Sequence, residues 1–580
     1  MAKKSRAARA ATPPPPGAAR KAAPARAGRA LPLWGAAVLV VQVVLMIAAF
    51  NPVAHNGGDT AGYVTLAHSL LDRGTYSDLW QPGQPPHTKY PPVFPALLAV
   101  AIALGARTWA ALKVVPALFT TLSVLLAYVW ARERRGAPFG AAVALLTAAS
   151  SGVLWSSHWE LSEPPFMALT FLSLWAYERV PHSGRWLALG AVAAGLAYFT
   201  RSAGLPLVVA AGAWLLLRRR WRAAAALTLG VGGLAVLWSL RGGQGAQYVS
   251  EFWMVDPYQP DLGRVGVGGL VQRVLDNSFT YVTQHVPTGL TGLGGSPAAL
   301  MGVALFGLAG WGWWRRLRAA PAVAELFVPM YLGLILLWPQ VWSGDRFALP
   351  LFPLLLFYAG ERILDLAGSL QPSARRVVAG LAIALVGAPS LAHWTGEVKT
   401  ASSCAALVRS EGAFACWGPR TYEFVEAAVW SGSHLPAGAV VLSRKPRIFY
   451  VESGLSSETF PFTKDVDRFL AFADSVGARY VVMDYLDGAA TAYVAEAVIA
   501  RGGAFCGLEG FTAGGSEVPT QILGIMPPDD RPEAEVRELA DGSASVAMRR
   551  CGADMVRAEP LPEQTARTQQ IPLLVGFTGS

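Results

Sequence analysis

Long apolar stretches separated by short polar connectors dominate the first two thirds of the chain. The first runs from Leu31 to Phe50 with only Gln42 interrupting it, which is long enough for a helix to cross a bilayer. A signal peptide is the rival interpretation, but the stretch is long for one and further apolar stretches follow at once. The pattern predicts a polytopic α-helical membrane protein with about eleven transmembrane helices. The other ten lie near residues 109–131, 138–155, 164–178, 186–200, 202–217, 223–240, 296–314, 322–341, 347–361 and 376–391.

The basic residues between these stretches set the orientation. If the N-terminus is cytoplasmic, every strongly basic connector also falls on the cytoplasmic side, as the positive-inside rule requires. Residues 1–30 hold eight Lys or Arg and no acid, which predicts a disordered basic cytoplasmic tail. The connectors are Arg132 to Arg135, Arg179 to Arg185, Arg218 to Arg220, Arg315-Arg316 and Arg375-Arg376.

After about residue 392 the pattern becomes that of a soluble domain, which the same orientation places outside the cytoplasm. Residues 439–443 and 480–484 are apolar runs typical of buried strands, and 466–477 has a helical period that ends at a glycine. An α/β domain is the natural interpretation. The predicted units are the tail at 1–30, a transmembrane domain at 31–391, an extracytoplasmic α/β domain at 392–526 and a poorly ordered C-terminal tail at 527–580.

The composition is that of a membrane protein. Hydrophobic residues make up 53% of the chain and charged residues only 15%, against about 25% charged in soluble proteins. The net charge of +10 raises nucleic acid as a partner. The basic residues are connectors, however, and no recognition motif accompanies them, so we expect membrane lipids and no nucleic acid as partners.

All four cysteines lie in the last third of the chain, and none has the close spacing of a zinc or redox motif. One or two disulfides are expected if that region is outside the cytoplasm, and four free thiols if it is inside. The sequence leaves their pairing open. They are Cys404, Cys416, Cys506 and Cys551.

A short amphipathic helix is predicted directly after the first span. Asp59 is a candidate N-cap for this helix, and Gly74 is a candidate stop. Such a helix would lie in the interface plane and hold Asp59 at the boundary of water and lipid. The segment from Pro91 to Gly105 is apolar but short, and we interpret it as re-entrant or interfacial. The apolar stripe of the helix consists of Tyr63, Leu66, Ala67, Leu70 and Leu71.

Five charged residues are predicted to lie together at the outer membrane surface. A carboxylate can deprotonate a hydroxyl or hold a divalent ion, while arginine and lysine stabilise a phosphate leaving group. Each also has a purely structural interpretation, since an acid can complement a helix N-terminus and a long basic side chain can reach lipid headgroups. The five are Asp59, Lys89, Glu163, Arg201 and Arg346.

Three outer loops carry motifs that resemble those of GT-C membrane glycosyltransferases, the group that contains protein O-mannosyltransferases and the aminoarabinose transferase of lipid A. The resemblance covers residues 31–391. The motifs are Gly58-Asp59, Tyr63, Leu70-Leu71-x-x-Gly74 and Lys89-Tyr90-Pro91-Pro92-x-x-Pro95 in the first loop, Ser162-Glu163-Pro164 in the second, and Asp345-Arg346-Phe347-x-x-Pro350-x-x-Pro353 in the third.

The resemblance implies an inverting transfer of a sugar from a polyprenyl-phosphate carrier to an acceptor hydroxyl on the outer face of a bacterial inner membrane. Asp59 is then the general base or the carboxylate that orients the acceptor, and Glu163 is the second acid. Tyr63, Lys89, Arg201 and Arg346 contact the substrate and its phosphate. Many relatives have two adjacent acids in the first loop, whereas Thr60 follows Asp59 here. Participation of a divalent metal is therefore left open.

Two other classes of function stay open. A transporter or flippase of lipid-linked saccharides predicts internal repeats and charged residues in the middle of spans, and neither is evident. A non-catalytic membrane scaffold predicts that Asp59 and Glu163 are replaceable. The sequence leaves open the sugar and the oligomeric state, and the acceptor could be lipid, glycan or protein.

Overall fold

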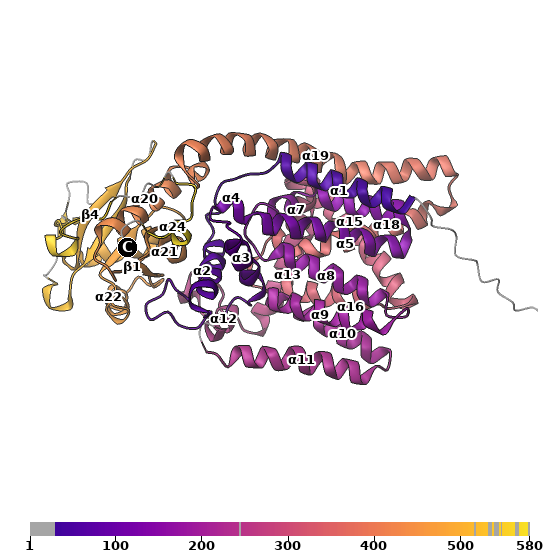
Figure 1. The fold of residues 1–580 in the computed structure, drawn as a ribbon, viewed down its shortest axis with the longest axis horizontal. Coiled ribbons are helices and arrows are strands. Elements are labelled where there is room, and N and C mark those ends of the chain that lie inside the picture. Colours follow the sequence, from indigo (N-terminus) through magenta and orange to yellow (C-terminus); the bar gives the residue numbers. More distant parts are fainter. Residues whose placement is uncertain are drawn as a thin grey trace, which may run out of the picture.

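Two parts of the chain are distinct in the computed structural model, a long helical bundle and a smaller C-terminal part that contains a β-sheet (Figure 1). The predicted N-terminal tail lies outside the described residues except for Ala30. The structure describes residues 30–242, 245–514, 518–531, 536–538, 544–546, 548–562, 566 and 568–577.

Helical structure occupies each of the eleven stretches predicted to cross the membrane. Among the described residues, five helical segments are long and apolar enough to span a bilayer by length and composition, so the count of eleven stays a prediction. The helices are α1 (Ala30–Ala48), α5 (Val114–Arg135), α6 (Ala137–Ala149), α8 (Glu163–Glu178), α9 (Gly184–Thr200), α10 (Leu205–Leu217), α11 (Trp221–Ser239), α15 (Gly295–Ala319), α16 (Val323–Leu336), α18 (Phe352–Leu366) and α19 (Pro372–Glu411).

Helix α19 passes beyond the predicted domain boundary at residue 391. It continues as one helix of 40 residues to Glu411 and runs from the bundle to the C-terminal part (Figure 1). Hydropathy indicates where the apolar surface of a helix ends, which is a different place from the end of the helix itself.

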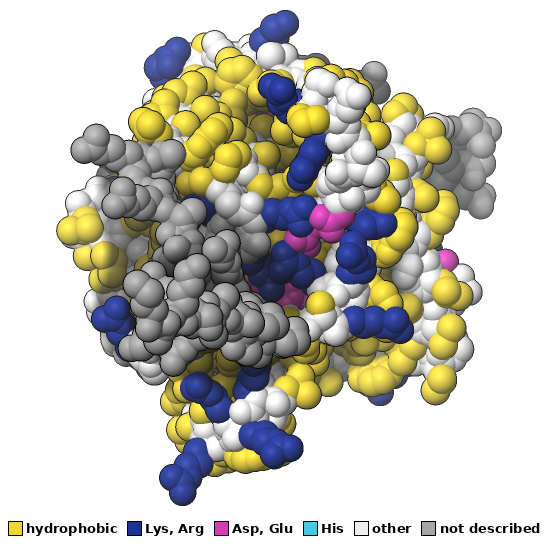
Figure 2. Space-filling view, turned by 90° about the vertical axis from the view of Figure 1, so that its right-hand side faces the viewer, with side chains coloured by type: hydrophobic (Ala, Val, Ile, Leu, Met, Phe, Trp, Pro, Cys, Tyr) yellow, Lys and Arg dark blue, Asp and Glu magenta, His cyan; other side chains and the backbone are white. Residues whose placement is uncertain are grey.

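Ion pairs join the helices at the end of the bundle remote from the C-terminal part. Arg134 at the end of α5 pairs with Glu325 of α16 at 2.7 Å, and Arg135 pairs with Glu361 of α18 at 2.8 Å. Arg316 of α15 pairs with the same Glu361. Figure 2 views this end of the molecule, where many lysine and arginine side chains surround a few acidic ones. The gathering of basic residues matches the predicted basic connectors.

The C-terminal part is built on a five-stranded sheet of order β2-β1-β3-β5-β4. Strands β1 and β3 and the helix α22 between them coincide with the two strands and the helix that the sequence predicts. The first three strands are parallel and the last two join antiparallel. The elements are β1 (Val440–Leu442), β2 (Ser456–Glu458), α22 (Val466–Ser475), β3 (Tyr480–Met483), β4 (Phe505–Phe511), β5 (Thr520–Ile525), α20 (Pro419–His434), α21 (Pro446–Ser453) and α23 (Glu496–Ala500).

Two disulfides hold the C-terminal part. Cys404 of α19 is bonded to Cys416, and Cys506 of β4 is bonded to Cys551. Ile571 is fully buried, and α24 (Pro572–Val575) packs against α21. The described residues after 527 are therefore more closely integrated than their charged, irregular composition predicts.

Helix α2 (Gly58–Arg73) lies between the bundle and the C-terminal part, packed against α3 (Val93–Ala103) and α21 (Figure 1). Its end at Gly74 is confirmed, because that glycine has the left-handed conformation with φ 60°. Helix α2 runs across the direction of the bundle helices (Figure 1), and its predicted position in the interface plane stays a prediction. Residues 60–67 are all buried, because α21 covers the face that the amphipathic pattern assigns to water.

Candidate active site

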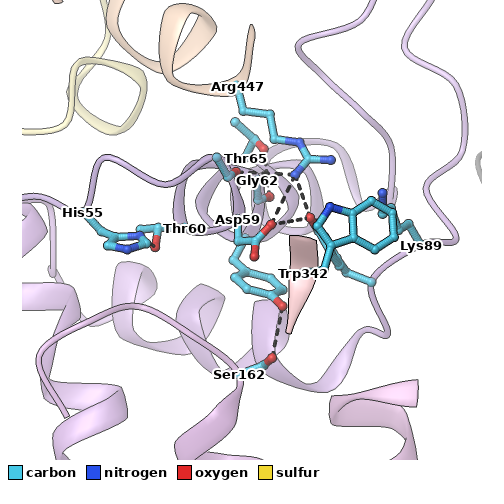
Figure 3. A network of polar contacts seen from close by, with 12 residues as sticks. His55, Asp59, Thr60, Gly62, Thr65, Lys89, Ser162, Trp342 and Arg447 are labelled. Atoms are coloured by element: carbon cyan, nitrogen blue, oxygen red, sulfur yellow. Dashed lines mark hydrogen bonds and ion pairs between the residues drawn. The ribbon is translucent and has the colours of Figure 1, made fainter. Parts of the chain in front are cut away.

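Asp59 lies in the first turn of α2, and its predicted role as N-cap is wrong. The N-cap is Gly57, and no side chain caps the helix. The carboxylate instead accepts a hydrogen bond of 2.7 Å from the Tyr90 hydroxyl, and Arg346 lies 3.4 Å from its other oxygen. Arg447 of α21 approaches to 3.9 Å (Figure 3). Asp59 thus lies where the first loop, the third loop and the C-terminal part meet.

The surrounding cations set the charge of Asp59. Its recessed position alone raises the pKa of the carboxyl, but Arg346, the Tyr90 hydroxyl and Arg447 together hold that pKa well below its usual range. The side chain keeps 35% of its surface exposed. Asp59 is therefore an ionised carboxylate that a substrate can reach.

Glu163 is the first residue of α8, where Pro164 and Pro165 begin the helix because proline suits its first positions. Its carboxylate pairs with Arg201 at 2.5 Å and lies 3.8 Å from Arg346. Arg346 therefore lies between the two acids that the sequence singles out.

A contact between two hydroxyl groups connects α2 to the start of α8. The Tyr63 hydroxyl lies 3.0 Å from Ser162 Oγ, which also accepts a hydrogen bond from Arg201 at 3.2 Å (Figure 3). Burial and the charge of Asp59 raise the pKa of Tyr63 well above its usual value, so its hydroxyl stays protonated. The structure thus brings Asp59, Tyr63, Glu163, Arg201 and Arg346 together.

Lys89 lies at the edge of this group. Its ammonium group is 3.3 Å from Glu251 of α12 (Gly245–Phe252) and 5.9 Å from the ring of Trp342 (Figure 3). It is close enough to contribute to the lowered pKa of Asp59. Lys89 thus binds an acid outside the Asp59–Glu163 group.

Sequence reasoning missed Arg447, whose guanidinium donates a 2.7 Å hydrogen bond to the Tyr90 hydroxyl. Gly62 makes room for this side chain, since a Cβ atom there would lie 3.0 Å from Arg447 Cδ. Tyr90 was part of a quoted motif but had no assigned role. No signal pointed to Arg447, because its contact with Asp59 joins residues nearly 400 positions apart.

The buried pair of Asp78 and His87 holds Tyr90 in place. The backbone N–H of Tyr90 donates to His87 Nε2 at 2.7 Å, so the other ring nitrogen carries the proton and donates to Asp78 at 2.6 Å. Both Asp78 and His87 are fully buried. The Tyr76 hydroxyl donates to the Tyr90 carbonyl at 3.0 Å. Tyr90 is fixed at both backbone groups, which fixes its hydroxyl against Asp59.

The side chains that could ligate a metal in this site do not fit a resident divalent cation. No three acidic, histidine or cysteine side chains come together at metal-binding distances among the residues that the structure describes. Asp59 and Glu163 both face arginines, whose charge opposes a bound cation. At the position of the second acid of many relatives, Thr60 is buried and lies 3.0 Å from His55 Nδ1.

Known proteins share this fold. Residues 89–240 match the family model of dolichyl-phosphate-mannose-protein mannosyltransferases. The oligosaccharyltransferase AglB of Archaeoglobus fulgidus, solved with an inhibitory peptide and dolichol phosphate, aligns at a TM-score of 0.52 and 14% identity over 94% of this chain and 78% of that chain. Its apo form gives a TM-score of 0.51 at 16% identity over 84% and 75% of the two chains.

ArnT of Cupriavidus metallidurans bound to undecaprenyl phosphate aligns at a TM-score of 0.48 and 15% identity, over 87% of this chain and 100% of that chain. No match was found among the curated proteins. The predicted resemblance to GT-C membrane glycosyltransferases is confirmed, in sequence over residues 89–240 and in fold over most of the chain.

Proposed function

We propose that this protein is an integral membrane glycosyltransferase that moves a sugar from a polyprenyl-phosphate carrier to an acceptor hydroxyl at the outer face of the membrane. One observation carries the proposal: an exposed, ionised carboxylate, Asp59, lies beside Arg346 in a site with an excess of positive charge. Three arginines face two carboxylates there, so an anion is the favoured ligand. The dolichol phosphate bound to AglB supports a polyprenyl phosphate as that anion.

Arg346 is the group that we assign to the donor phosphate. Arg201 and Arg447 are held at 2.5 Å by Glu163 and at 2.7 Å by Tyr90, and their side chains are only 15% and 16% exposed. Arg346 is 31% exposed, and its carboxylate contacts are longer, at 3.4 and 3.8 Å. It therefore gives up its present partners at the lowest cost.

In the transfer step, the acceptor oxygen forms a bond to the anomeric carbon of the sugar. The bond from that carbon to the phosphate oxygen breaks, and polyprenyl phosphate leaves with the electron pair. Asp59 orients the acceptor hydroxyl and receives its proton, and Arg346 stabilises the charge that develops on the leaving phosphate. Glu163 and Arg201 hold Arg346 and Ser162 in position from the other side.

Arg346 also links donor binding to the basicity of Asp59. While it faces Asp59, it keeps the pKa of that carboxyl low, and a carboxylate with so low a pKa is a weak base. A donor phosphate that takes Arg346 neutralises this positive charge and lets the pKa of Asp59 rise. This change of partner at Arg346 predicts that the donor binds first and makes Asp59 a stronger base for the acceptor hydroxyl.

We infer a bacterial inner membrane as the location. Two observations support an outer-face site with a cytoplasmic N-terminus and an extracytoplasmic C-terminal part. Basic residues gather at the end of the bundle opposite Asp59, as the positive-inside rule requires of the cytoplasmic side (Figure 2). The C-terminal part holds two disulfides, which persist in oxidising compartments.

The donor class is tested with purified protein, labelled polyprenyl-phosphate sugars and an extract of cell-envelope material as acceptor. We expect label in the acceptor fraction together with release of free polyprenyl phosphate, with and without a chelator. Nucleotide sugars serve as the matched donor control and should give no product without a polyprenyl-phosphate carrier. Transfer from nucleotide sugars alone would contradict the proposal.

A further inference from the structure

One exposed face of α15 changes in character along the helix. Leu300 and Val303 are 74% and 59% exposed, and about two to four turns further Trp311 and Trp314 are 50% and 44% exposed. Arg318 follows on the same face near the end of the helix. The order from apolar through aromatic to basic is that of a surface running from hydrocarbon through the interfacial belt to the headgroups.

Two of the four arginines at this end of α15 and α18 have carboxylate partners. Arg316 pairs with Glu361, and Arg315 pairs with Asp365 at 3.2 Å. Arg318 and Arg362 differ, because neither has an ion pair or hydrogen bond to any residue that the structure describes. Two positive charges are therefore left without a counter-ion at the edge of a face suited to lipid.

The exposed tryptophans hold both unpaired guanidinium groups. Arg362 of α18 stacks 3.7 Å from the ring centre of Trp311, and Arg318 lies 4.4 Å from that of Trp314. The Nε atom of Arg362 is buried and has no hydrogen-bond partner among the described residues. Stacking of this kind fixes the guanidinium planes and leaves their outer N–H groups free to donate to an anion.

We propose that Arg318 and Arg362, stacked on Trp314 and Trp311, bind the phosphate of an anionic phospholipid at the end of the bundle remote from the active site. The apolar face of α15 at Leu300 and Val303 receives the acyl chains, which identifies the ligand as a lipid rather than a soluble phosphate. The proposal is independent of the transferase chemistry, because none of these residues contacts the Asp59 site.

The test uses full-length protein in nanodiscs of phosphatidylcholine with a minor share of phosphatidylglycerol. Lipids that remain bound after mild detergent extraction are counted by mass spectrometry. We expect selective retention of phosphatidylglycerol by the wild type and about tenfold less by R318Q/R362Q. The control is R375Q/R376Q, which removes two exposed arginines of α19 at the same end of the bundle that lie on no aromatic ring of the described residues, and it should retain phosphatidylglycerol like the wild type.

Equal loss in both double variants would show a diffuse charge effect and overturn the proposal, as would equal retention in all three proteins. If R318Q/R362Q fails to fold, the variant R362K tests the proposed lipid site instead. It keeps the charge but loses the planar guanidinium that lies over the Trp311 ring, and we expect about threefold less phosphatidylglycerol. Unchanged retention by R362K would overturn the site.

Discussion

The guanidinium of Arg346 lies 3.4 Å from the carboxylate of Asp59, although the two residues are 287 positions apart in the chain. The same guanidinium lies 3.8 Å from Glu163, the second acid of the site. Because Arg346 is the most exposed and most loosely held arginine of this group, a substrate phosphate competes with Asp59 for it. This competition ties donor binding to the state of the proposed base.

Replacing Asp59 by asparagine is expected to strengthen binding of polyprenyl phosphate while it abolishes transfer. Without the carboxylate, Arg346 loses a competing partner, and we expect affinity for the carrier to rise about three- to tenfold. Titration of the labelled carrier into purified protein measures the effect. The control Asp345→Asn removes a nearby acid whose carboxylate accepts a hydrogen bond of 2.8 Å from the backbone N–H of Arg346. An equal gain in both variants would contradict the exchange at Arg346.

The close approach of Arg447 to Gly62 predicts that a larger residue at position 62 lowers the transfer rate. In Gly62→Ala the new Cβ would lie 3.0 Å from Arg447 Cδ and displace the guanidinium from Tyr90 and Asp59. We expect transfer to fall about tenfold, the usual cost of disturbing a hydrogen bond to a charged group. The matched control is Gly58→Ala in the same helix, where a Cβ meets nothing within 4 Å. Equal rates in both variants would exclude a role for Arg447.

Glu452 of α21 predicts a pH-dependent stability. Burial raises the pKa of its carboxyl to about 8. The folded protein thus holds a proton that the unfolded chain releases near pH 4.5, and stability falls as pH rises between these values, by at most about 1.4 kcal/mol per pH unit. In Glu452→Gln this fall should disappear. Thermal unfolding at about pH 5 and pH 8 measures it, and the exposed Glu496→Gln is the control. The same slope in Glu452→Gln and the wild type would refute the assignment.

The proposed orientation predicts that both disulfides lie on the outer side of the membrane. Intact cells treated with a reductant and then a maleimide, neither of which crosses membranes, should become labelled at Cys416 and Cys551, the partly exposed cysteine of each disulfide. Omission of the reductant should abolish labelling, because the four thiols are paired. Labelling that requires cell lysis would place the C-terminal part on the cytoplasmic side.

Much of the fold follows from local pattern. Apolar period and length predicted a helix in each of the eleven stretches, and glycine chemistry predicted the end of α2 at Gly74. The predicted boundary at residue 391 marks the end of the apolar surface of α19, and the helix itself continues to Glu411. Burial of both faces of α2 depends on α21, which is distant in sequence and leaves no periodic signal in residues 58–73.

The candidate site was predictable in part. Asp59, Tyr63, Glu163, Arg201 and Arg346 were expected at one membrane surface, and the structure brings them together. Capping was the simplest local role for Asp59, yet tertiary partners at Tyr90 and Arg346 take its carboxylate. Arg447 could not be found, since a lone arginine in an α/β segment has no pattern that relates it to a loop nearly 400 residues earlier.

The most direct test of the account is a single-turnover transfer assay that compares wild type with Asp59→Asn at saturating labelled polyprenyl-phosphate sugar. We expect the wild type to pass label to the acceptor fraction, and Asp59→Asn to bind the donor but transfer at least about 100-fold more slowly. An Asp59→Asn protein that binds donor and transfers at the wild-type rate would contradict the central claim.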